Sequence, residues 1–69
     1  MENYINNIFN RQSETEIKDL LYSFCNENGG DIHEIDNAIE KAQEFKTVDL
    51  WGGDRYNREG INIMLNHLI

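Results

Sequence analysis

Apolar residues recur at helical spacing along most of the chain, and the clearest case is the segment 31–45. Its apolar side chains fall at i, i+3, i+4, i+7 and i+10, which lines one side of an α-helix: Ile35, Ala38, Ile39, Ala42 and Phe45. On the other side, Asp36, Glu40 and Glu44 fall at i, i+4 and i+8 and form one carboxylate stripe. Like charges at this spacing repel by about 0.2–0.5 kcal/mol per pair, and Lys41 alone is close enough to relieve them. The pattern predicts an amphipathic helix with an acidic outer side.

A second helix is predicted over residues 13–28. Ser13 and Glu16 have the spacing of a capping box, in which each side chain accepts a hydrogen bond from the other residue's backbone N–H. The apolar positions that follow keep helical spacing: Ile17, Leu20, Leu21, Phe24 and Cys25. Gly29 and Gly30 supply a left-handed C-terminal cap, and Asp31 with Glu34 repeats the start signal. Two helices with so short a connection should pack as roughly antiparallel neighbours.

The two ends of the chain add further helical patterns. Residues 1–10 have apolar positions at helical spacing but no cap, so they form either a short helix or an arm. A last helix should begin after Asn57, with one apolar face made of Ile61, Met64, Leu65, Leu68 and Ile69. Residues 47–54 read as a loop, with one helical turn at 49–51 as an option, and no segment has strand alternation. The expected fold is a single all-α domain, residues 1–69, built as a three- or four-helix bundle.

The composition describes a small acidic protein. A chain of 69 residues buries only about 60% of its unfolded surface, so its core is small and its stability marginal. The lone cysteine, Cys25, fits a reducing compartment, and there is neither a secretory leader pattern nor an apolar run of about 20 residues, so we expect a cytoplasmic location. The net charge of −7 opposes binding to nucleic-acid phosphates and to anionic lipid.

The sequence offers little catalytic or metal-binding chemistry. Cys25 lies on an apolar helix face, where a buried structural thiol is expected, and His33 and His67 lie on different predicted helices. His33 near Asp36 and Asn37 has the spacing of a chance metal contact, but a solvated histidine is the simpler interpretation. The glycine pairs lack the longer pattern of a phosphate-binding loop. We therefore expect no enzyme activity, no metal and no cofactor.

Protein binding is the remaining class of function. The segment after the acidic helix holds Trp51, Arg55 and Tyr56 beside Asp49 and Asp54, and Trp, Tyr and Arg are the residues enriched at interface hot spots. Two alternatives stay open, since Trp51 and Tyr56 would also serve to cover the open end of a small core, and the acidic stripe would also serve as an ordinary solvated surface.

The chain resembles the immunity proteins of nuclease colicins and pyocins. The family pattern T-E-x-E-F-x-x-L-V-x-x-I-C-N of the first helix is matched without a gap by residues 13–26, SETEIKDLLYSFCN. The register continues at Glu34, Ile35, Ile39 and Phe45, and Asp49-Leu50 and Glu59-Gly60-Ile61 look like the openings of the family's last two helices. The family motif D-L-I-Y-Y-P is represented by Asp49-Leu50 alone, so that Trp51 and Tyr56 would replace its paired tyrosines.

The resemblance implies a four-helix fold and an inhibitory function. Members of the family bind and neutralise a nuclease toxin, and the exposed positions of their second helix carry over to Ile32, Asp36, Glu40 and Gln43. Together with the stripe and the aromatic segment, the expected residues for binding a basic protein partner are Ile32, His33, Asp36, Glu40, Gln43, Glu44, Asp49, Trp51 and Tyr56. Two alternatives differ in class: a phosphate-mimicking regulator of a host nucleic-acid enzyme, and a structural domain that self-associates through Ile63.

Overall fold

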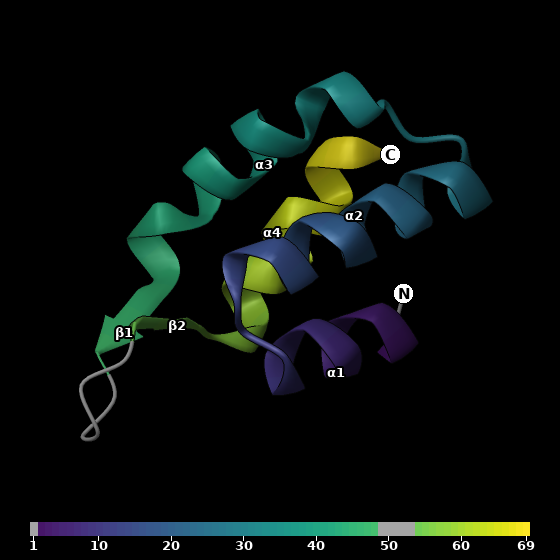
Figure 1. Cartoon of the computed structure of the whole chain (residues 1–69). Helices are drawn as coiled ribbons and strands as arrows, with labels where there is room; N and C mark the ends of the chain where they lie inside the picture. The colour runs from purple at the N-terminus through teal and green to yellow at the C-terminus, as the bar shows by residue number, and fades with distance from the viewer. Residues whose placement is uncertain (1, 49–53) are drawn as a thin grey trace.

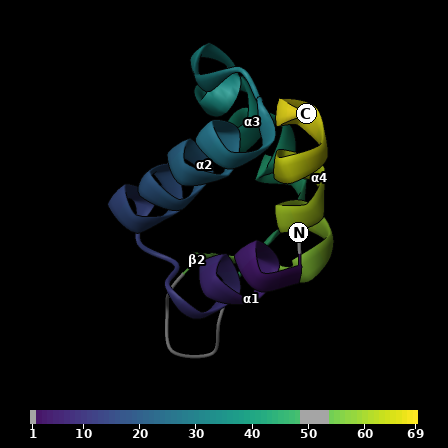
Figure 2. The same cartoon turned by 90° about the vertical axis from the view of Figure 1, so that its right-hand side faces the viewer.

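The computed structural model describes residues 2–48 and 54–69 and confirms an all-α bundle of four helices (Figures 1 and 2). The helices are α1 (Glu2–Asn10), α2 (Glu14–Asn28), α3 (Ile35–Lys41) and α4 (Arg58–Leu68). Two 3₁₀ segments flank α3, η1 (Ile32–Glu34) and η2 (Ala42–Phe45), and two short strands, β1 (Lys46–Val48) and β2 (Asp54–Tyr56), precede α4. Helix α4 contacts the other three α-helices, so the last helix of the chain is the centre of the bundle.

The core is formed by one face of each helix. The predicted faces of α2 and α3 point into it, and α4 contributes Ile61, Met64, Leu65 and Leu68, all at most 2% exposed. Ile69 was predicted on the same face but is 68% exposed, because α4 ends at Leu68. The buried residues are Ile8, Ile17, Leu21, Phe24, Cys25, Ile35, Ala38, Ala42, Tyr56, Ile61, Met64, Leu65 and Leu68.

The ends of α2 follow the sequence signals closely. Ser13 is the N-cap, and its Oγ accepts a hydrogen bond from the Glu16 N–H at 3.2 Å. The second hydrogen bond of the predicted capping box would run from the Ser13 N–H to the Glu16 side chain. The Ser13 N–H instead donates to the Arg11 carbonyl at 2.7 Å. Gly29 adopts the left-handed conformation with φ 72°, and the Gly30 N–H donates to the Cys25 carbonyl at 3.0 Å, as in a Schellman motif.

The segment predicted as one helix from Asp31 to Phe45 is divided into η1, α3 and η2. At its start, Asp31 Oδ1 accepts a hydrogen bond from the His33 N–H at 2.9 Å, which closes a tight first turn and favours 3₁₀ geometry. At its end, η2 leads directly into β1. The apolar spacing correctly predicted the buried side, but spacing does not distinguish an α-turn from a tighter 3₁₀ turn.

Two short strands lie where the sequence showed only weak strand signals, so the interpretation of Thr47, Val48 and Asp54 as loop residues was wrong. Strands β1 and β2 pair antiparallel, with Lys46 opposite Tyr56, Thr47 opposite Arg55 and Val48 opposite Asp54. The Gln12 side chain supports β2 from the other side: its Nε2 donates to the Tyr56 carbonyl at 3.0 Å, and its Oε1 accepts from the Tyr56 N–H at 3.1 Å. Strands of three residues show too little alternation to be recognised in sequence, and these depend on a residue 44 positions away.

Helix α1 exists as a helix and packs against α2 and α4. Ile8 is fully buried, and the Tyr4 ring meets the Phe24 ring edge to face, with 5.2 Å between centroids and 87° between planes. At its C-terminal end, the Phe9 carbonyl accepts a hydrogen bond from Arg55 at 2.7 Å, and the guanidinium groups of Arg55 and Arg58 lie 5.2 and 4.8 Å from the Phe9 ring centroid. These contacts fasten the N-terminal helix to the last quarter of the chain.

The contact between α1 and α2 should set an alkaline limit to stability. A hydrogen bond to Glu27, partial burial and the negative charge of Glu27 together raise the pKa of Tyr4 from 10.0 to about 12. The folded chain therefore keeps Tyr4 neutral where the unfolded chain ionises it, so this contribution is complete below pH 10 and is lost as the pH rises towards about 12. In Tyr4→Phe, urea unfolding across this pH range should show a smaller alkaline loss. Tyr22→Phe, at an exposed tyrosine, is the control, and a loss of stability in Tyr4→Phe identical to that of the wild type would contradict the prediction.

Candidate protein-interaction surface

Three carboxylates follow the outer side of α3 and η2, and we call Asp36, Glu40 and Glu44 the acidic crest. All three are exposed, as the sequence predicted, and the Asp36 side chain is 84% exposed. They occupy this side because Ile35, Ala38 and Ala42 turn the opposite side of the same segment into the core. The segment therefore has a negatively charged outer side, and its apolar side packs into the core.

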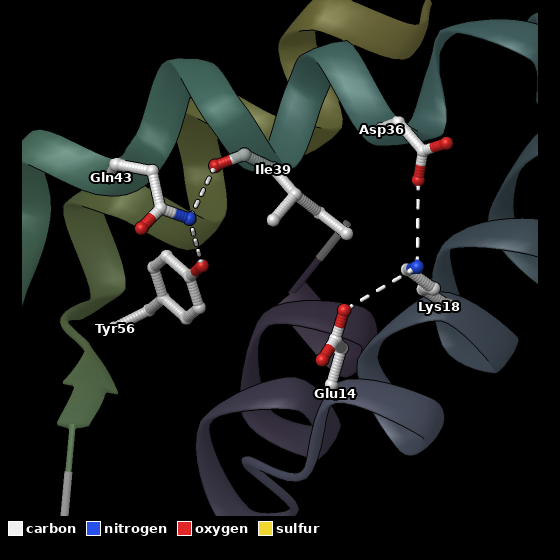
Figure 3. A network of polar contacts seen from close by, with 6 residues as sticks. All are labelled: Glu14, Lys18, Asp36, Ile39, Gln43 and Tyr56. Carbon is white, nitrogen blue, oxygen red and sulfur yellow. Dashed lines mark hydrogen bonds and ion pairs between the residues drawn. The ribbon is translucent and has the colours of Figure 1, made fainter.

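The crest is partly compensated by a cation that the sequence did not indicate (Figure 3). Lys18 on α2 places its Nζ 3.5 Å from Glu14 Oε1 and 3.6 Å from Asp36 Oδ1. The expectation that only Lys41 relieves the stripe is therefore wrong, because the neighbouring helix supplies another base. Both pairs are largely exposed, so each contributes only about 0–1 kcal/mol. Within the described residues, no basic group lies at ion-pair distance from Glu40 or Glu44.

A hollow of about 550 Å³ lies between the acidic crest and α4. Phe45 and Ile63 give it apolar walls, and Glu40 and Glu44 lie along its α3 side together with Lys41. On the α4 side, His67 Nε2 lies 3.2 Å from Glu34 Oε1. Ile63, which the self-association alternative required to be exposed, is only partly accessible inside this hollow.

A second, smaller hollow of about 180 Å³ lies on the other flank of the crest, between α2 and η2. Its lining includes Ile17, Ile39 and Tyr56 together with the polar residues Gln12, Glu14, Gln43 and Lys46. Gln43 spans this flank, since its Nε2 donates to Tyr56 Oη at 2.6 Å and to the Ile39 carbonyl at 3.2 Å (Figure 3). The acidic crest therefore lies between two depressions, a larger one beside α4 and a smaller, more polar one beside α2.

The predicted binding residues divide into separate groups. Asp36, Glu40, Gln43 and Glu44 are exposed on α3 and η2, and Ile32 and His33 are exposed on η1. Tyr56 is only 5% exposed, so it covers the end of the core, as the alternative interpretation expected, and offers no open ring to a partner. Asp49 and Trp51 lie outside the described residues.

The structure adds one residue that the sequence reasoning missed. Tyr22 on α2 is 49% exposed, the highest exposure of a large aromatic side chain among the described residues. It falls outside the apolar pattern of its own helix, which runs through Ile17, Leu21 and Phe24. An aromatic residue placed off the core face was the available signal.

Cys25 has the buried position that the sequence predicted. It is 2% exposed, and burial, followed by the negative charge of Asp31, raises the pKa of its thiol, which favours the protonated form. Across residues 2–48 and 54–69, no three His, Cys, Asp or Glu side chains come together as a metal site requires. No helix of the described segments has the length and apolar character to cross a membrane.

Comparisons with known proteins do not place the chain in a family. No protein-family model, curated protein or solved structure matches it.

Proposed function

We propose that this protein is an acidic protein-binding inhibitor, and specifically an immunity protein that neutralises a basic nuclease toxin in the cytoplasm. The observation that carries the proposal is the acidic crest, in which Glu40 and Glu44 are exposed without a described basic partner. An exposed carboxylate edge beside a hollow with apolar walls combines long-range attraction for a basic surface with area that a partner can bury.

The mechanism is exclusion and needs no reaction. The nucleic-acid-binding surface of a nuclease is basic, because it must neutralise phosphates. An acidic edge docked there steers association and prevents DNA or RNA from approaching. Apolar contacts formed after the encounter slow dissociation. The resemblance of residues 13–46 to nuclease immunity proteins supports the same partner class.

The test reverses the two unpaired charges. In a pull-down from a lysate of the source cells, the wild-type chain should retain one basic nuclease, and Glu40→Lys/Glu44→Lys should bind it at least about tenfold more weakly, mainly through a slower association rate. The matched control is Glu16→Lys/Asp19→Lys, which changes two exposed carboxylates of α2 by the same total charge. Circular dichroism should show that both variants remain folded.

Each other outcome has a defined meaning. Equal losses in both double variants would show that net charge, and not the acidic crest, governs binding, whereas equal retention would remove the crest from recognition. If the wild type instead retains many basic proteins, all released by modest salt, the chain acts as a phosphate mimic and the immunity function is wrong.

A further inference from the structure

Exposed apolar side chains are few in this small protein and two of them lie close to the acidic crest. Among the described residues, the large apolar side chains that are more than a third exposed are Tyr22 at 49%, Ile32 at 37% and Ile69 at 68%. Ile69 lies just beyond the last residue of α4, whereas Tyr22 and Ile32 lie on α2 and η1, which pack against each other. No core position explains either residue.

The ion pair between α2 and α3 fixes where these two residues lie. Lys18 meets Asp36 at 3.6 Å, and the two helical segments run in roughly opposite directions (Figure 1). Tyr22 follows Lys18 by four residues, and Ile32 precedes Asp36 by four, so both are displaced by about one turn towards the same end of the helix pair. Tyr22 and Ile32 therefore flank the α2–α3 seam on one side of the ion pair.

On the other side of the ion pair, the seam leads to the smaller hollow, where Ile39 is partly exposed and Ile17, at 2% exposure, belongs to the core. Ile39 lies seven residues beyond Ile32, three steps of which are in the 3₁₀ segment η1 and four in α3, so the two are about 12 Å apart at about 2.0 and 1.5 Å per residue. Apolar residues at i, i+7 and i+8 on one face of another helix span about 10–12 Å. The seam thus offers two apolar positions at the spacing of one face of a docking helix.

The charges around the seam favour a cationic ligand. Glu14 and Asp36 are 81% and 84% exposed beside these apolar positions, and Glu40 and Glu44 continue the negative field along the acidic crest. Lys18 is shared between Glu14 and Asp36, and Lys46 lies at the far hollow, so carboxylates exceed cations along the track.

We propose that the α2–α3 seam is the docking track for a cationic amphipathic helix of the partner, with Tyr22 and Ile32 as its apolar anchor at one end and the partly exposed Ile39 as its anchor at the other. This inference rests on the proposed function, because it specifies the basic partner's binding element. An amphipathic helix laid in an apolar groove is a common mode of recognition, and its anchors follow i, i+3, i+4 and i+7 spacing.

The experiment uses a synthetic helical peptide with leucines at i, i+3 and i+7 and lysines on the remaining face. Its binding to the full chain is titrated by fluorescence anisotropy, and a peptide with glutamates in place of the lysines is the charge control. The lysine peptide should bind saturably and the glutamate peptide should not. Tyr22→Ser and Ile32→Ser should each weaken binding at least about tenfold, Tyr22→Phe should retain it, and Ile69→Ser should have no effect.

Contrary results are equally clear. Equal affinity of the lysine peptide for the wild type and for Tyr22→Ser/Ile32→Ser, or the absence of saturable binding, would overturn the proposal. Self-association of the wild type that Tyr22→Ser abolishes, seen by sedimentation, would assign the seam to a second copy of the chain and would also overturn it. Loss of nuclease binding in the acidic-crest variant tests the proposed function separately, so the two failures are distinguishable.

Discussion

Phe24→Ala should leave most of the chain unfolded at room temperature. Among residues 2–48 and 54–69, Phe24 is the largest fully buried side chain, at 1% exposure, and its ring meets that of Tyr4 of α1 edge to face. Removing a buried phenylalanine costs about 3–5 kcal/mol. A domain of this length rarely has more than about 3–5 kcal/mol of stability, and the single free cysteine provides no disulfide to add to it. Loss of the far-ultraviolet helical signal in the absence of urea is the expected measurement.

Tyr22→Ala is the matched control for this change. It removes an aromatic ring from the same helix two positions earlier, where the ring is 49% exposed. Its urea midpoint should stay close to that of the wild type. If both variants lost stability equally, burial of the ring would not determine the result, since alanine is the stronger helix former at both positions. A stable Phe24→Ala would mean that the core closes over the missing ring.

Gly30→Ala should destabilise the chain by about 2–3 kcal/mol, the upper part of the range for overpacking. A Cβ at this position would lie 2.5 Å from the Leu68 carbonyl oxygen and 3.1 Å from Cys25 Sγ. The carbonyl belongs to the backbone and also accepts a hydrogen bond from the Asp31 N–H at 3.2 Å, so moving it breaks that bond. Urea unfolding gives the loss of stability, and amide hydrogen exchange should show an unprotected Asp31 N–H.

Gly29→Ala separates this steric effect from backbone conformation. Gly29 has φ 72°, but no atom lies within 4 Å of an added Cβ. Its cost should be the intrinsic penalty of the left-handed conformation, about 1–2 kcal/mol, with the Asp31 amide still protected. If the Asp31 amide also lost its protection from hydrogen exchange in Gly29→Ala, the whole turn would have moved. The clash with the Leu68 carbonyl would then not explain the effect of Gly30→Ala.

The helices and their buried faces could be predicted because their signals are local. The Ser13 and Asn57 caps, the Gly29 C-cap and the apolar spacing each act over a few residues, and the structure uses all of them. The exposure of the acidic crest could also be predicted from local spacing, since the face opposite Ile35, Ala38 and Ala42 has to point outward.

The features that could not be predicted depend on residues far apart in sequence. Lys18 reaches Asp36 only because α2 and α3 are neighbours, and the short strands depend on Gln12 and Tyr56, which are 44 positions apart. The burial of Tyr56 follows from that contact and from the hydrogen bond of its hydroxyl to Gln43. These long-range contacts also decide which aromatic side chain a partner can reach. Tyr56, which the sequence suggested as an anchor, is buried, and Tyr22 is exposed.

The attachment of α1 to the end of the chain also constrains how the molecule is made. Gln12 bonds to Tyr56, Arg55 to Phe9 and Arg58 to Asn6, across 44, 46 and 52 positions. During synthesis on a ribosome, the first helix emerges long before the residues that hold it. Helix α2 can cover part of its apolar side early, because the Tyr4 ring meets the Phe24 ring, but the contacts with Arg55, Tyr56 and Arg58 form only after β2 and α4 have been made. The final fastening of α1 is therefore a late, long-range step of folding.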